Sequence, residues 1–209
     1  MDADTPFPGE PADSREAIMR ATFLALKQYG YAGLSIQRIA DKADLSKSTF
    51  YHHYDDKQDL LTAFVDYILA EFTRAFSMEA SDDPLENFRT YVDLILDPES
   101  ISELEDPSPA TAVLGTYVEL RAQAVQDETF RAKFTEIDRA FEDQLAEIIA
   151  DGIAAGVFRD VDPDRTATFL LTMIAGHTFR RTTRDDDPTD AVRAEFDNYV
   201  ERTLRHTPE

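Results

Sequence analysis

The stretch LSKSTFYHHYDDK, residues 45–57, sets how the whole chain is interpreted. Ser46 stands before KSTFYHH, and a serine there predicts a helix start because its hydroxyl can accept a backbone N–H of the first turn. Another short helix is predicted upstream over IQRIADKA, with Ser35 as its N-cap, and ADLS forms a tight turn between the two. Two short helices joined by such a turn make a helix-turn-helix.

The second of these helices carries side chains suited to a DNA groove. In a helix-turn-helix, the second helix usually enters the major groove. Lys47 can reach a guanine edge or a phosphate, and the short side chains that follow it allow a close approach. Tyr51 and His52 can donate to phosphate or lie on a thymine methyl or a sugar. The predicted DNA contacts are Ser35, Gln37, Arg38, Lys47, Ser48, Thr49, Tyr51, His52 and Lys57.

These features alone leave other interpretations open. Helix-turn-helix geometry also occurs in proteins that bind no nucleic acid. The run from Tyr51 to Tyr54 could serve packing, and His52 and His53 point apart on one short helix, which does not suit a shared metal ion.

The rest of the chain predicts an all-α fold of about nine helices. Nearly every segment repeats apolar residues every three or four positions, and none alternates as a strand does. Residues 1–13 are acidic and proline-rich, so we expect a short disordered arm. Residues 14–60 predict a three-helix domain with the helix-turn-helix, and residues 61–209 a larger helical domain.

The charge is placed unevenly along the chain. The formal net charge is −21, yet residues 14–60 hold seven Lys/Arg against six Asp/Glu. The acids therefore lie mostly outside the predicted DNA-binding segment. An acidic chain with few lysines is typical of proteins from salt-accumulating halophiles, whose dense carboxylates keep the surface hydrated. An ordinary acidic cytosolic protein is the alternative.

Several classes of protein are disfavoured by what the sequence lacks. The absence of cysteine excludes disulfides, thiolate metal sites and thiol nucleophiles. We find no glycine-rich phosphate loop, nucleophile elbow or HExxH, and therefore predict no enzymatic activity, no cofactor and no metal site. No apolar run approaches eighteen residues, which predicts no membrane span. The first thirteen residues do not resemble a signal peptide, so we expect a cytoplasmic protein.

The run from Arg15 to Leu61 resembles the N-terminal domain of the TetR/AcrR family of transcriptional regulators. The matching pieces are an alanine-rich first helix, the turn GYAGLS, then IQRIA, SKSTFY, and an aromatic residue ahead of DDKQDLL. The later part loosely resembles the branch whose last two helices follow a turn like GVFRDVDP. The resemblance implies an all-helical fold of nine or ten helices and a ligand-responsive DNA-binding regulator, with repressors the commonest kind.

Residue roles follow from the resemblance only at matching positions. Lys47 and Ser48 would face bases. Thr49, Tyr51 and Lys57 would hold phosphates, with help from the start of the first short helix. The family usually has glycine where Asp44 stands and often where Ser48 stands. Aspartate tolerates the left-handed conformation of such a turn, and Ser48 adds a donor, so the operator sequence does not carry over from relatives.

A palindromic operator requires a two-fold dimer. In relatives the last two helices, here about 162–181 and 188–206, form a four-helix bundle with their mates. Our candidates for this interface are Phe169, Met173, Phe196, Tyr199, Val200 and Leu204. The alternative is that these side chains pack only within one chain.

The resemblance also implies a small-molecule effector bound among the middle helices. Candidate lining residues are Phe88, Tyr91, Ile95, Tyr117, Leu120, Arg121, Phe134, Ile137, Phe141 and His177. Ordinary core is the alternative for each, because aromatic residues at helical spacing are typical of cores. The apolar lining favours a mostly hydrophobic effector. Arg180, Arg181 and Arg184 could bind an anionic head group, but we favour neutralisation of the DDD that follows them.

The sequence leaves several points open. It identifies neither the effector, the operator nor the target genes, and it does not separate repressor from activator or say whether one or two dimers bind an operator. A helical small-molecule carrier that no longer binds DNA is the alternative function.

Overall fold

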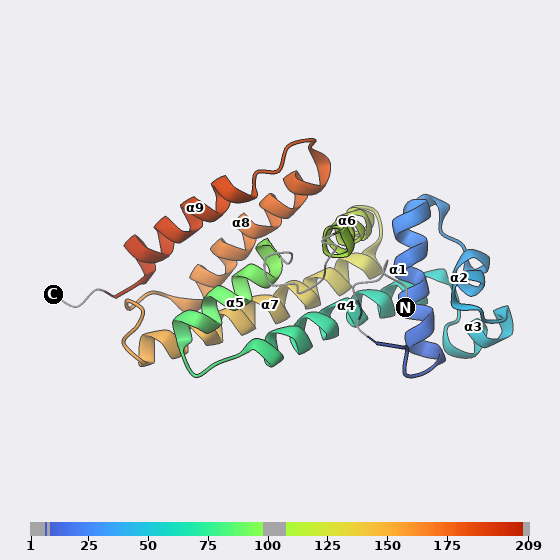
Figure 1. The fold of residues 1–209 in the computed structure, drawn as a ribbon, viewed down its shortest axis with the longest axis horizontal. Helices are drawn as coiled ribbons and strands as arrows, with labels where there is room; N and C mark the ends of the chain where they lie inside the picture. The colour runs from blue at the N-terminus through green and yellow to red at the C-terminus, as the bar shows by residue number, and fades with distance from the viewer. Residues whose placement is uncertain (1–6, 8, 98–107, 207–209) are drawn as a thin grey trace. The chain divides into compact units, whose positions relative to one another are not determined.

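The computed structural model describes residue 7 and residues 9–97 and 108–206. Within them the chain forms nine α-helices and no β-strand, which confirms the all-α prediction (Figure 1). The elements are α1 (Ser14–Gly33), α2 (Ile36–Ala43), α3 (Lys47–His53), α4 (Lys57–Glu79), α5 (Pro84–Leu96), α6 (Ser108–Gln123), α7 (Glu128–Ala154), α8 (Pro163–Thr183), α9 (Thr189–Tyr199) and the π-helical segment η1 (Val200–Leu204).

The packing divides the chain into two compact units. The first contains the described residues of Met1–Glu71 and Leu104–Thr135, and the second those of Phe72–Glu103 and Glu136–Glu209. The helix-turn-helix therefore shares a unit with α6 and the start of α7, although these lie more than fifty residues further along the chain.

The first unit has a core of aromatic and aliphatic side chains from α1, α4, α6 and α7. Phe23 of α1 and Phe64 of α4 have no exposed surface, and Leu120 of α6 and Phe130 of α7 are 1% exposed. Removing such a side chain from water stabilises a fold by about 1.5–3 kcal/mol. α1 and α4, which flank the helix-turn-helix, thus share their core with α6 and α7.

The start of α1 differs in one residue from the prediction. The sequence offers Ser14 as an N-cap for the first helix, but Asp13 caps it, and its Oδ1 accepts the N–H of Glu16 at 2.9 Å. Ser14 is instead the first helical residue, and its Oγ lies 2.8 Å from His53 Nε2. Two adjacent residues were both good caps, and the contact with His53 was not visible in the sequence.

The predicted acidic arm lies partly outside the described residues, but Phe7 is described and is buried. Its ring centroid lies 5.6 Å from that of Phe23 and 5.0 Å from that of Tyr67. Arg20 donates to Gly9 O at 2.5 Å. These contacts fasten the described part of the arm to the first unit.

The second unit is built from α5, the end of α7, α8 and α9, and α8 contacts both α5 and α9 (Figure 1). Phe88 of α5 is fully buried, with its ring 5.6 Å from Phe158 and 6.2 Å from Phe196. Tyr91 donates its hydroxyl to Phe141 O at 2.9 Å. Burial raises the pKa of Tyr91, so the hydroxyl stays protonated as a donor.

Ion pairs join the polar edges of these helices. Arg193 of α9 donates to Asp93 at 2.7 Å and to Asp97 at 3.3 Å. Arg181 of α8 lies 3.6 Å from Asp97 and 3.3 Å from Asp187. Together they connect α5, α8 and α9 around the start of α9.

Candidate DNA interface and effector pocket

The helix-turn-helix forms where its short polar residues cap both helices. Ser35 accepts the N–H of Arg38 at 3.3 Å and Ser46 accepts that of Thr49 at 3.2 Å, so both predicted N-caps are confirmed. Asp44 ends α2 at φ 53° and ψ 41°, the left-handed conformation predicted for the turn. Aspartate adopts this conformation at lower cost than most residues with a Cβ.

A small core holds α2 and α3 at their angle. Ile39 and Phe50 are at most 1% exposed, and Ala40 is 2% exposed. The Phe50 ring lies 5.4 Å from that of Tyr51 and 5.8 Å from that of Tyr54. One face of α3 is therefore fixed by packing, which orients the opposite face.

That opposite face exposes four of the predicted DNA contacts, Lys47, Ser48, Tyr51 and His52. Tyr51 is 55% exposed even though its ring edge touches Phe50. Ser48 Oγ lies 2.7 Å from Ser46 Oγ, so the hydroxyl is held near the helix start. α3 thus presents an ammonium, a phenol, an imidazole and a hydroxyl on one surface.

The other predicted contacts are engaged within the chain. Ser35 caps α2, Gln37 donates to Asp41 at 2.5 Å, and Thr49 Oγ1 lies 3.0 Å from Ser46 Oγ. Arg38 donates to Gly33 O, and its guanidinium lies 4.2 Å from the centre of the Tyr29 ring. Their roles towards DNA stay predictions.

Lys57 is directed at the end of α1 in this structure. Its Nζ lies 3.4 Å from Tyr31 O, 3.5 Å from Leu34 O and 4.4 Å from the centre of the Tyr31 ring. The side chain is half-buried. This contact was not predictable from residue types, because its partners are backbone carbonyls.

Two further bonds tie α3 to α1. His53 bonds Ser14, as described above, and Arg15 Nε donates to the Tyr54 hydroxyl at 3.2 Å. The hydrogen bond to Tyr54 raises the pKa of Arg15, and burial raises the pKa of Tyr54. α1 therefore holds the C-terminal end of α3.

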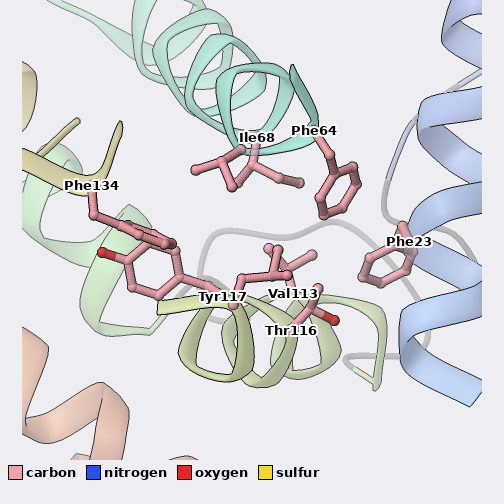
Figure 2. Close-up of a pocket in the computed structure, with 9 residues that line it drawn as sticks. Phe23, Phe64, Ile68, Val113, Thr116, Tyr117 and Phe134 are labelled. Atoms are coloured by element: carbon pink, nitrogen blue, oxygen red, sulfur yellow. The ribbon is translucent and has the colours of Figure 1, made fainter. Parts of the chain in front are cut away.

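A small apolar cavity lies in the same unit, between α1, α4, α6 and α7 (Figure 2). Its volume is about 10 Å³, which is room for about one water molecule. Figure 2 shows Phe23 pointing in from α1, Phe64 and Ile68 from α4, and Phe134 facing Tyr117 of α6. The residues that line it are Phe23, Phe64, Val65, Ile68, Val113, Thr116, Tyr117, Leu120 and Phe134.

The cavity contains only part of the predicted pocket. Tyr117, Leu120 and Phe134 line it, and Arg121 lies beside them, donating to the Tyr117 hydroxyl at 2.8 Å. Its α1 and α4 residues, and Val113 and Thr116 of α6, were not predicted. The apolar residues among them have the same spacing as core residues. Phe23 was also not considered as a pocket residue, because it lies in the predicted DNA-binding domain.

The remaining predicted pocket residues belong to the second unit. Tyr91 and Phe141 form an aromatic cluster with Phe72, and Ile95 packs against the same core. Phe88 and Ile137 are buried. His177 is 3% exposed, and its Nε2 lies 3.3 Å from Thr189 Oγ1. None of these side chains lines the cavity of the first unit.

The predicted dimer residues divide into two groups. Phe196, Val200 and Leu204 are at most 4% exposed, because they face the core of their own chain. Phe169 is 47% exposed, and its ring lies 5.6 Å from that of Tyr199; Met173 and Tyr199 are partly buried. Phe179, which was not among the candidates, is 57% exposed on the same helix.

The arginines at the end of α8 pair with the acids that follow them. Arg184 donates to Asp186 at 2.6 Å, and Arg181 lies 3.3 Å from Asp187. The hydrogen bond from Arg184 lowers the pKa of Asp186. For Arg181 and Arg184, these pairs bear out the favoured prediction of charge neutralisation.

Two further findings concern the described part of the chain. It contains no group of three or more metal-ligating side chains placed to hold an ion. None of its helices combines the length and the apolar character needed to cross a bilayer.

Two known protein families match the N-terminal and the C-terminal part of the chain. Residues 18–64 match the family described as bacterial regulatory proteins, tetR family. Residues 101–205 match the C-terminal family of BetI-type transcriptional repressors. The matched segments contain the helix-turn-helix and the helices from α6 to α9.

Individual relatives agree with these matches. A solved TetR transcription regulator from Haloarcula marismortui is 33% identical over 93% of this chain and 100% of that one, with a TM-score of 0.81. The repressor AcnR of Corynebacterium diphtheriae is 25% identical over 91% of each chain. The regulator BetI of Stenotrophomonas maltophilia is 38% identical over 82 residues, and this chain spans only 42% of its length.

Proposed function

Because the chain belongs to the TetR family of bacterial regulatory proteins, we propose that it represses transcription by binding a palindromic operator as a homodimer. A small, mostly apolar effector releases it. The observation that carries the proposal is the polar face of α3, where Lys47, Ser48 and Tyr51 are exposed opposite the buried Phe50.

The face of α3 supports recognition of base edges and backbone together. Lys47 is long enough to reach a guanine, while Tyr51 and His52 suit phosphate and sugar. The acidic surface is no obstacle, because residues 14–60 are near neutral. In a hypersaline cell, counterion release adds little affinity. Binding then depends on base contacts and shape, so we expect a shallow dependence of affinity on salt.

The outer face of α8 supports the homodimer. Phe169 and Phe179 are exposed there, with the exposed Thr172 and Gly176 between them. Large exposed apolar side chains along one helix face are candidates for a contact surface. Phe169→Ser with Phe179→Ser is expected to give a monomer by sedimentation, with helical content unchanged. A double variant that remains dimeric contradicts this interface.

The cavity supports an effector that is apolar and not cationic. Its lining is aromatic and aliphatic, and a guanidinium already lies near two of the rings. Arg121 Cζ is 5.8 Å from the centre of the Tyr117 ring and 5.3 Å from that of Phe134. A cationic ligand would compete with this charge for the same ring faces. Thermal stabilisation by tetramethylammonium and not by neutral apolar compounds contradicts this class of effector.

DNA binding is the part of the proposal to test first. Duplexes selected from a random library with the purified protein give the operator, and fluorescence anisotropy across a potassium chloride series gives its affinity. Lys47→Ala is expected to weaken binding by about 1–3 kcal/mol if the ammonium contacts a guanine. Tyr51→Ala is expected to weaken it as well.

Lys27→Ala is the matched control, because it removes the same charge from α1 outside the helix-turn-helix. An equal loss in Lys27→Ala and Lys47→Ala indicates general electrostatics and not recognition. A folded protein that enriches no sequence supports the alternative of a DNA-free ligand carrier.

A further inference from the structure

The end of α1 is held by a side chain from α6. Glu119 Oε1 accepts the backbone N–H of Tyr31 at 2.7 Å, across 88 positions of sequence. Both residues belong to the first unit, where α1 and α6 are in contact. A carboxylate that accepts a backbone N–H makes a stronger bond than a neutral acceptor does.

The backbone of α1 is shaped for this approach. Gly30 interrupts the helix with φ 63° and ψ 176°. A Cβ on Gly30 would lie 2.9 Å from Glu119 Oε1. Gly30 is therefore required for two reasons. Its φ is left-handed, and the Glu119 carboxylate occupies the space beside its Cα.

Tyr31 also receives contacts from α4 and α7. Lys57 of α4 approaches its carbonyl and its ring, as described above, and the Phe130 ring of α7 lies 6.5 Å from the Tyr31 ring. Lys57 also approaches Leu34 O, immediately before the Ser35 cap of α2. A shift of Tyr31 therefore shifts the start of α2, and with it α3.

The neighbouring face of α6 lines the cavity. Val113, Thr116 and Leu120 face it, and Glu119 lies one residue before Leu120. At about 10 Å³ the cavity is too small for an effector. An effector that enters between α1, α4 and α6 must therefore separate them, and the short Glu119–Tyr31 bond spans two of these helices.

We propose that Glu119 is the positioning residue through which α6 holds α1, α2 and α3 in the DNA-binding arrangement, and that effector entry breaks its bond to Tyr31. This inference rests on the proposed function, since it assigns the closed cavity to the DNA-bound state. Glu119 acts through the backbone of Tyr31, whose carbonyl Lys57 also approaches.

The test compares Glu119→Ala with Glu119→Gln, because glutamine keeps an oxygen that accepts the Tyr31 N–H. On the selected duplex, Glu119→Ala is expected to bind about tenfold more weakly, and Glu119→Gln within about threefold of the parent. Glu128→Ala removes the same charge from an exposed site at the start of α7 and is expected to match the parent. Equal affinity of Glu119→Ala and the parent overturns the inference.

Hydrogen exchange supplies a readout that needs no DNA. The Tyr31 amide is expected to lose protection in Glu119→Ala and to keep it in Glu119→Gln, while amides in the middle of α7 stay protected in both. Unchanged protection of Tyr31 in Glu119→Ala overturns the inference. Failure of the parent to select any duplex counts against the proposed function instead, and the exchange result then decides whether the bond exists.

A double-mutant cycle tests the link to the cavity. Val113→Phe adds bulk to the lining and stands in for an effector. It is expected to weaken DNA binding in the parent and to add nothing in Glu119→Ala, since the bond it would break is already absent. Additive losses overturn the link between cavity and bond.

Discussion

The helices α3 and α8 differ in which side chains they expose and which they bury. α3 exposes Lys47 and Tyr51 and buries Phe50. α8 exposes Phe169 and Phe179 and buries His177 at 3% exposure. A polar outer face suits water and nucleic acid, whereas an outer face with exposed aromatic rings suits cover by another protein surface. The kind of side chain on the exposed face thus separates the two proposed interfaces.

The largest effect we expect comes from two adjacent residues of α3. Phe50→Ala is expected to lower the free energy of unfolding by about 3–5 kcal/mol, because Phe50 is 1% exposed. Tyr51→Ala is expected to lower it by about 1 kcal/mol or less, since the ring is mostly exposed. Urea unfolding followed by circular dichroism measures both. Similar losses in the two variants contradict the division of α3 into a core face and a binding face.

The second unit allows a comparable test of its core. A Cβ at Gly152 of α7 would lie 2.1 Å from Cδ2 of the buried Phe158, so Gly152→Ala forces the ring to move. We expect a loss of about 1–3 kcal/mol in the free energy of unfolding. Gly115→Ala is the matched control in α6, where a Cβ meets nothing within 4 Å. It is expected to gain about 0.5–1 kcal/mol, and a gain at both sites contradicts the packing against Phe158.

The sequence predicted α3 well because its determinants are local. Ser35, Asp44 and Ser46 act on backbone groups within three residues, so caps and turn follow from residue type. The exposed side of α3 also followed, because Phe50 was the one large apolar residue that had to face inwards. The fold class was predictable for the same reason, since helical spacing is a local pattern.

The pocket and the end of α1 depend on partners distant in sequence. Phe23 and Ile68 have the spacing of ordinary core residues, and nothing local distinguishes a residue that lines a cavity from one that fills a core. Glu119 and Lys57 bind backbone groups, which every residue has. The burial of Phe196, Val200 and Leu204 was missed because an apolar stripe does not say whether it meets its own chain or another.

The buried His177 of α8 predicts a pH dependence. Burial lowers the pKa of His177; Arg181 lowers it further, while a backbone hydrogen bond at Leu96 and the carboxylates of Asp187 and Asp97 oppose the shift. A depressed folded-state pKa means that the unfolded chain takes up the proton first. The stability contributed by neutral His177 is therefore complete above the unfolded pKa, near 6.5, and is lost as pH falls through the folded pKa.

Urea unfolding between pH 7.5 and 5 measures this effect. The free energy of unfolding is expected to fall with a slope of at most about 1.4 kcal/mol per pH unit for this one proton. His177→Gln removes the titrating group and is expected to show a flatter profile. The other histidines remain in both proteins, so parallel profiles contradict a role for His177.

The smallest effect we expect lies at the turn between α2 and α3. Asp44 is the only described residue other than glycine with a positive φ, at 53°. Asp44→Gly removes the Cβ that disfavours this conformation, but it also frees the unfolded chain. The expected net gain in the free energy of unfolding is therefore only about 0.5–1 kcal/mol.

Asp44→Ala is the control, since it keeps the Cβ and loses the carboxylate. A gain in the glycine variant, a loss in the alanine variant and unchanged DNA affinity in both indicate that Asp44 shapes the turn without contacting DNA. Tighter DNA binding by both variants instead indicates that its charge repels the phosphates.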